Sequence, residues 1–153
     1  MDDRQRHGGG AGIRDRLFRR LFMEVNELMV GDWVSVAGTP MKVACIGTNR
    51  IGFEDSKGEI FFHDADNVEA IELYTLLLEG NGFILVENET PAWELEFRSC
   101  YGVEKVKIDY SGHGSKLFAY DEDKSESIEL SIRYVHQLQH ALRLMGIDKE
   151  IKI

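Results

Sequence analysis

Cysteine is scarce in this chain of 153 residues, which contains only Cys45 and Cys100. Two cysteines cannot form the disulfide framework that stabilises small secreted domains, so we expect reduced thiols in a cytoplasmic protein. The sequence also lacks any apolar run near the ~20 residues needed to cross a bilayer. Its Arg-rich start has no apolar core segment, so neither a signal peptide nor membrane association is expected.

Positive charge is also in short supply, because 18 Lys and Arg residues face 27 Asp and Glu residues, for a net charge of −9. Residues 1–22 carry six Arg and three Asp, so the remaining chain carries −12. An acidic surface repels a phosphate backbone, which disfavours general nucleic-acid binding. A small barrel that binds nucleic acid through Lys42, Arg50 and Lys57 is kept as an alternative.

The first 22 residues differ in composition from the rest of the chain. Residues 1–12 are polar and then Gly-rich, so they bury nothing to offset ordering entropy, and we expect disorder there. Residues 13–22 have the pattern of a short basic amphipathic helix, which is typical of a membrane-surface or partner-binding segment. Because the composition changes at Met23, we expect residues 1–22 to be a leader that is not part of the native protein.

Residues 23–72 have the pattern of a small antiparallel β structure. Segments of strand-like composition at 32–37, 41–46, 51–54, 59–63 and 68–73 are separated by turn sequences containing Gly, Asp or Asn. Five short strands with tight turns predict an SH3-like small β-barrel, and closure of that barrel would remove exposed edges. A turn is expected at residues 38–40.

Residues 73–153 predict an antiparallel β-meander packed on one C-terminal helix, which assigns the chain to the α+β class. A short helix is expected at residues 74–82 because glycines end it. Strands are expected at 83–87, 93–98, 106–110, 116–120 and 128–132. The tail at residues 150–153 could add an edge strand, and the meander could pack with the barrel as one unit.

The strongest helix signal covers residues 131–146, with Ser131 as the expected cap and Gly146 just past the end. At the helical period, one face of this segment is apolar and must be covered by the strands. That face consists of Tyr134, Val135, Leu138, Ala141, Leu142 and Met145. His136 and His140 project opposite to it, so we expect both imidazoles to be solvated.

The two histidines also allow a metal-site interpretation, because His residues four apart on a helix can bind one ion. Gln137 occupies the position where metalloproteases have a Glu general base, and a third ligand would have to come from elsewhere, for example His63 or His113. A metal-binding protein or hydrolase that uses His136 and His140 is therefore kept as an alternative only.

Aromatic residues supply the candidates for a contact surface. Phe61 and Phe62 fall in one expected strand, where successive side chains point to opposite faces, so one of the two rings must point outward. An outward ring is the best indication of a contact surface in this sequence. Trp33 is a further candidate, although most aromatics in so small a barrel are expected to fill its interior.

Four segments carry a resemblance to a known family, namely residues 26–34, 39–43, 76–83 and 134–139. The most specific is Tyr-Val-His-Gln-Leu-Gln at 134–139. Through them the chain from 24 to 153 resembles a family of small uncharacterised proteins encoded in prophages and mobile elements of Bacteroidetes. The resemblance implies a cytosolic accessory protein of such an element, and it supplies no activity, cofactor or functional residue. Members commonly lack a His at the position of His140, which disfavours the metal site.

The sequence thus favours a non-enzymatic binding module whose partner is a protein or a second copy of the chain. Its contact residues are expected on the barrel and on the polar face of the long helix. They are Trp33, Phe61, Phe62, Arg133, His136, Gln137 and His140. No cofactor is expected, and no residue is given a catalytic role.

Overall fold

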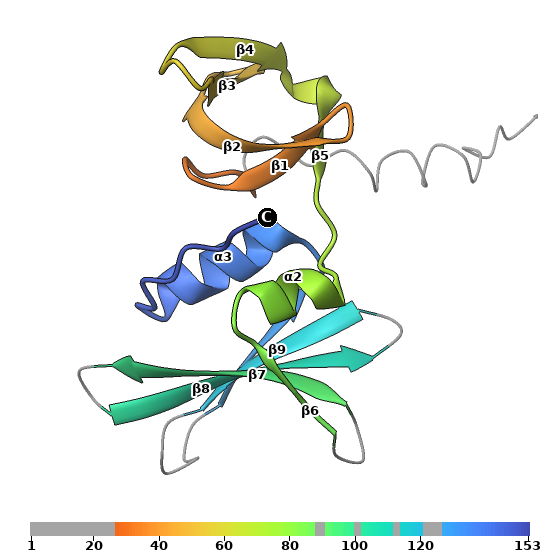
Figure 1. Cartoon of the computed structure of the whole chain (residues 1–153). Coiled ribbons are helices and arrows are strands. Elements are labelled where there is room, and N and C mark those ends of the chain that lie inside the picture. Colours follow the sequence, from red (N-terminus) through yellow and green to blue (C-terminus); the bar gives the residue numbers. More distant parts are fainter. Residues whose placement is uncertain (1–26, 88–90, 100–101, 112–113, 121–126) are drawn as a thin grey trace, which may run out of the picture.

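The computed structural model describes residues 27–87, 91–99, 102–111, 114–120 and 127–153. These residues form two five-stranded antiparallel sheets and few helices (Figure 1). The α+β class predicted from the sequence is therefore confirmed.

The first sheet is formed by the part of the chain before residue 71. Its elements are β1 Trp33–Val36, β2 Thr39–Ile46, β3 Arg50–Glu54, β4 Ile60–Asp64, the 3-10 helix η2 Ala65–Asn67, and β5 Val68–Ala70. The strand order is β4-β3-β2-β1-β5. Within the described chain no ladder joins β4 to β5, so the closure expected of a barrel is not confirmed.

The buried apolar residues of the first sheet gather in one core cluster. The buried set is Leu28, Val34, Val36, Val43, Ile51, Phe53 and Val68. The expected turn at residues 38–40 lies slightly earlier in the structure. Ala37 and Gly38 form it, both with positive φ, and Thr39 already pairs with Val36.

The second sheet follows a short helix, α2 Thr75–Gly80, which confirms the helix expected at residues 74–82. Its strands are β6 Ile84–Val86, β7 Ala92–Ser99, β8 Gly102–Ser111, β9 Gly114–Tyr120 and β10 Ser127–Ile132. Each strand pairs with the next one in the chain, so the antiparallel meander is confirmed. Residues 88–90, 112–113 and 121–126, which separate the expected strands, lie outside the described residues.

The long helix α3 spans Val135–Leu144, so the start predicted at Ser131 is wrong. Ser131 and Ile132 belong to β10, where Ser131 pairs with Lys116 of β9. The helix instead begins after Tyr134. The side chain of Gln137, in its first turn, accepts hydrogen bonds from the backbone just before the helix. Its Oε1 accepts hydrogen bonds from the backbone N–H groups of Arg133, at 2.8 Å, and Tyr134, at 3.2 Å.

Helix α3 lies between the two sheets (Figure 1). Its apolar face, with Val135, Leu138 and Leu142, joins the core of the second sheet, as predicted. Its opposite face contacts β1 of the first sheet. An amphipathic sequence pattern predicts that only the apolar face of a helix is covered. Helix α3 is also covered on its polar face, through polar contacts with the first sheet.

The tail after α3 runs back along the helix without regular structure (Figure 1), so the edge strand considered at residues 150–153 is absent from the described tail. Ile147 and Ile151 are buried in the same core as α3. Neither α-helix of the described chain has the length and apolar character that a bilayer span requires.

Candidate functional site

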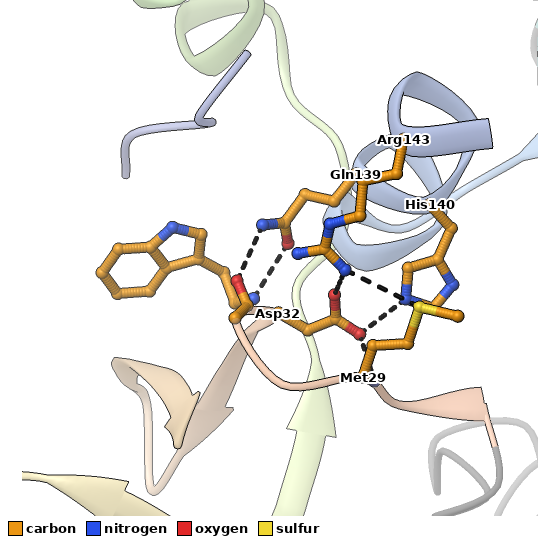
Figure 2. A network of polar contacts seen from close by, with 7 residues as sticks. Met29, Asp32, Gln139, His140 and Arg143 are labelled. Atoms are coloured by element: carbon orange, nitrogen blue, oxygen red, sulfur yellow. Dashed lines mark hydrogen bonds and ion pairs between the residues drawn. The ribbon is translucent and has the colours of Figure 1, made fainter. Parts of the chain in front are cut away.

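Asp32 lies immediately before β1, and its side chain is fully buried against α3. Its carboxylate accepts hydrogen bonds from the Met29 backbone N–H at 2.7 Å and from Nη1 of Arg143 at 3.0 Å (Figure 2). It also bonds Nε2 of His140 at 2.7 Å. Because a carboxylate only accepts, this contact places a proton on Nε2. A buried charge is tolerated when it is paired and hydrogen-bonded in this way.

We call Met29, Asp32, His140 and Arg143 the Asp32 cluster. Gln139 makes a second polar connection between α3 and the first sheet beside this cluster. Its Oε1 accepts a hydrogen bond from the Trp33 backbone N–H at 2.9 Å. Its Nε2 donates to the Gly31 carbonyl at 3.0 Å (Figure 2). One buried amide side chain therefore satisfies both a donor and an acceptor of the backbone leading into β1.

His136 is fully buried, and the expectation that both helix imidazoles are solvated is wrong. Among the described residues, neither ring nitrogen of His136 has a hydrogen-bond partner, and the ring stacks on Tyr134 with 5.7 Å between centroids. Burial lowers the pKa of His136 from 6.5 to about 4, with the nearby His140 acting in the same direction and Asp32 opposing it. His136 is therefore a neutral group at pH 7.

A cavity of about 310 Å³ lies beside the two histidines. Its lining consists of Glu27, Leu28, Met29, His136, Gln137 and His140. The imidazole centroids are 5.8 Å apart, and a neutral imidazole is the form that binds metal. Within the described residues, however, no group of three or more His, Cys, Asp or Glu side chains could hold an ion.

Of the two third ligands considered from the sequence, only His63 belongs to the described residues, and it does not complete a metal site. His63 packs in the first sheet against Phe53 and Phe61. His113 lies outside the described residues. The metal-site alternative therefore remains a prediction that rests on the His136 and His140 pair.

The remaining predicted contact residues of the helix segment have partners within the described chain. Arg133 donates from Nη2 to Glu72 at 2.6 Å and lies over the ring of Tyr134. Gln137 caps the first turn of α3, and His140 holds Asp32. The structure thus brings His136, Gln137 and His140 to one cavity, but it does not present them as a solvated face.

Among the three aromatic candidates only one points outward. The indole of Trp33 is partly buried and donates from Nε1 to the Ile151 carbonyl at 2.7 Å. Phe61 packs on Phe53 in the interior of the first sheet. Phe62 is 52% exposed, so the prediction that one ring of the adjacent pair points outward is confirmed.

Gly52 explains how the neighbouring side chains gather around Phe62. It pairs with Phe62 of β4 on one side and with Cys45 of β2 on the other. A Cβ atom at Gly52 would lie 2.3 Å from Sγ of Cys45 and 3.0 Å from Cε1 of Phe62. The missing side chain therefore leaves room for Cys45, Ile60 and Phe62 to cover this part of the outer face.

The basic residues of the nucleic-acid alternative do not form an unpaired patch. Lys42 pairs with Glu150 of the tail, and Arg50 pairs with Asp64 across β3 and β4 at 3.3 Å. Two of the three cations are thus neutralised by carboxylates, which disfavours phosphate binding on this face.

Sequence reasoning missed Asp32, Gln139 and Arg143 as members of a site. Asp32 is a polar residue just before an apolar strand, and such a position is only weak evidence that a residue belongs to a site. Its partner His140 is 108 residues away in the chain, so no local spacing could reveal the contact.

No family model, curated protein or solved structure matches this chain.

Proposed function

We propose that this protein is a non-enzymatic binding module that docks a protein partner on β4 and the surface beside it. We call this surface the outer patch and define it as Cys45, Ile60 and Phe62, which surround the buried Gly52. The observation that carries the proposal is the exposure of Phe62 in the middle of a regular strand. Fully burying a Phe side chain is worth about 1.5–3 kcal/mol, which a partner that covers the ring would gain.

The position of the outer patch supports a protein partner over other ligands. Ile60 is 45% exposed next to Phe62, and both project from an edge strand of the first sheet. An edge strand offers backbone hydrogen bonds, and an adjacent apolar patch offers burial, which is the combination that peptide and protein strands use. Neither feature suits a small polar substrate.

The helix face is not proposed as the docking site because His136 is fully buried and the neighbouring polar groups have partners within the described chain. Asp32 and His140 bind each other, and Gln139 binds the backbone before β1. Catalysis is not proposed either. Among the residues that line the cavity, none is a Ser, Thr or Cys nucleophile.

We further propose an SH3-like arrangement for the first sheet and a cytoplasmic accessory role in a phage or mobile element. The strand order and the 3-10 helix η2 between β4 and β5 support the former. The latter rests on the resemblance of the four sequence segments. Two of them, 26–34 and 134–139, contact each other through Trp33 and Gln139.

Photocrosslinking in the host cell tests the docking proposal. A benzophenone amino acid replaces Phe62 in one variant and Leu144 in a control, because Leu144 is 82% exposed on α3, away from the outer patch. We expect covalent protein adducts from position 62 and none from position 144. The captured partner, once purified, should bind the wild-type chain and the Leu144→Lys variant, but not Phe62→Lys.

Two results would contradict the proposal. One is the absence of adducts at position 62 under conditions in which the chain is expressed and folded. The other is equal adduct formation at both positions, since that would show capture by chance collision rather than by a docked partner.

A further inference from the structure

The backbone of β4 has three residues whose hydrogen-bonding groups are turned away from the rest of its sheet. β3 and β4 pair in an antiparallel register in which Gly52 faces Phe62. Just beyond the two ends of this ladder, the N–H of Asp55 donates to Glu59 at 2.9 Å, and the N–H of Ala65 donates to Asn49 at 3.0 Å.

Hydrogen-bonded and non-hydrogen-bonded pairs alternate along an antiparallel ladder. The bonds at residues 59 and 65 therefore place residues 61 and 63 in hydrogen-bonded pairs with β3. Ile60, Phe62 and Asp64 fall in the other class, so their N–H and C=O groups point to the free edge of the sheet. No described strand pairs with that edge.

Nothing in the composition of β4 blocks this edge. Natural proteins protect edge strands with Lys, Pro or a bulge, and β4 reads Ile-Phe-Phe-His-Asp with an uninterrupted register. Ile60 and Phe62 are exposed there, as is Asp64, whose side chain is 65% accessible. The edge thus combines unpaired backbone groups with exposed apolar side chains.

We propose that the occupant of the outer patch is a second copy of this chain, which pairs its own β4 antiparallel to the first about a two-fold axis at Phe62. This proposal rests on the proposed function and names the partner of the same surface. In this register Phe62 faces Phe62 of the second copy, and Ile60 faces Asp64. The backbone N–H and C=O groups that point outward from these three residues of one strand then pair with those of the same three residues in the other strand.

Side-chain contacts favour the same register. The two Phe62 residues form a pair with about 5.5 Å between Cα atoms, close enough for ring contact. The first sheets of the two copies thus join at β4 into one continuous sheet of ten strands, and the two-fold symmetry closes the assembly as a dimer.

Hydrogen exchange combined with sedimentation tests the pairing on the purified full chain. We expect a dimer, with slow amide exchange at Ile60, Phe62 and Asp64 as well as at Phe61 and His63. In the Phe62→Lys variant we expect a monomer in which residues 60, 62 and 64 exchange at least tenfold faster. Residues 61 and 63 should stay slow, because their bonds to β3 remain, and this also shows that the variant is folded.

The control variant Leu144→Lys carries the same substitution at an exposed site on α3 and should remain a dimer. A monomeric wild-type chain, an assembly larger than a dimer, or fast exchange at residues 60, 62 and 64 in the wild type would each overturn the two-fold pairing. If the chain is monomeric but position 62 still crosslinks to a different protein in cells, the self-pairing fails while the proposed binding function stands.

Discussion

Nε2 of His140 lies 2.7 Å from Oδ2 of Asp32, and this contact joins the long helix to the first sheet across 108 residues of sequence. The carboxylate is fully buried, whereas the His140 side chain is 20% accessible. With the bond from Arg143 and the bonds of Gln139, it gives α3 a second covered face. The relative position of the two sheets therefore depends on a small number of polar side chains.

The first prediction concerns the charge of Asp32. The Asp32→Asn substitution keeps the shape but places an amide N–H₂ against groups that donate hydrogen bonds. We expect the free energy of unfolding to fall by about 2–3 kcal/mol, allowing for the partial exposure of Arg143 and His140. Urea denaturation measures the change. Asp64→Asn, which removes an exposed pair with Arg50, should cost less than about 0.5 kcal/mol, and an equal loss in both variants would contradict the assignment.

The second prediction is a loss of stability in mild acid. Folding lowers the pKa of His136 from 6.5 to about 4, chiefly through burial, so between these values the unfolded chain binds a proton that the folded chain does not. Stability is therefore full above about pH 6.5 and falls as the pH decreases, by roughly 3 kcal/mol when pH 4 is reached. Urea midpoints measured across this range test it.

Matched variants assign the acid effect to its residue. His136→Leu should remove most of the pH dependence between about pH 6.5 and pH 4, whereas Asn67→Ala, which changes an exposed group that does not titrate, should leave it in place. A wild-type chain whose stability does not change over this range would show that His136 is accessible to protons in the folded state.

The third prediction concerns the two ring nitrogens of His136, which have no hydrogen-bond partner among the described residues. A buried polar group without a hydrogen bond costs about 1–3 kcal/mol, and Leu has a similar volume without that cost. We expect His136→Leu to raise the free energy of unfolding at pH 7 by about 1 kcal/mol. A clear loss of stability would mean that the imidazole has a role that its contacts within the described chain do not show, such as binding an ion or a ligand in the neighbouring cavity.

Some of this structure could be read from the sequence, and the rest could not, for a physical reason. Alternation predicted that one ring of the Phe61 and Phe62 pair points outward, and helical spacing placed Leu138 in the core, because these patterns depend on local geometry alone. The burial of His136 depends instead on the first sheet, whose strand β1 lies about 100 residues earlier in the sequence and covers the polar face of α3. No periodicity encodes that contact, since Gln139 and Asp32 are polar residues that ordinarily face water.

The fourth prediction concerns Gly52 beneath the outer patch. Gly52→Ala places a Cβ atom 2.3 Å from Sγ of Cys45 and 3.1 Å from Cγ2 of Ile60, so a neighbour must move. We expect a loss of about 1–3 kcal/mol in the free energy of unfolding. Cys45→Ala removes the closest atom, so the double variant should recover at least half of that loss. If the second substitution gave no recovery, the crowding would have to come from elsewhere.

The fifth prediction concerns Asn81, which fixes the tail after α3. Its Nδ2 donates to the Lys152 carbonyl at 2.8 Å, and its Oδ1 accepts from the Lys152 N–H at 2.8 Å. Asn81→Ala removes both bonds, so we expect the Lys152 amide to exchange with solvent about tenfold faster, equivalent to about 1.4 kcal/mol. Amides of α3 should keep their protection, because the apolar face of this helix is packed in the core of the second sheet. Asn67→Ala, on the exposed 3-10 helix η2, should leave Lys152 unchanged, and acceleration throughout α3 would show that the tail and the helix open together rather than separately.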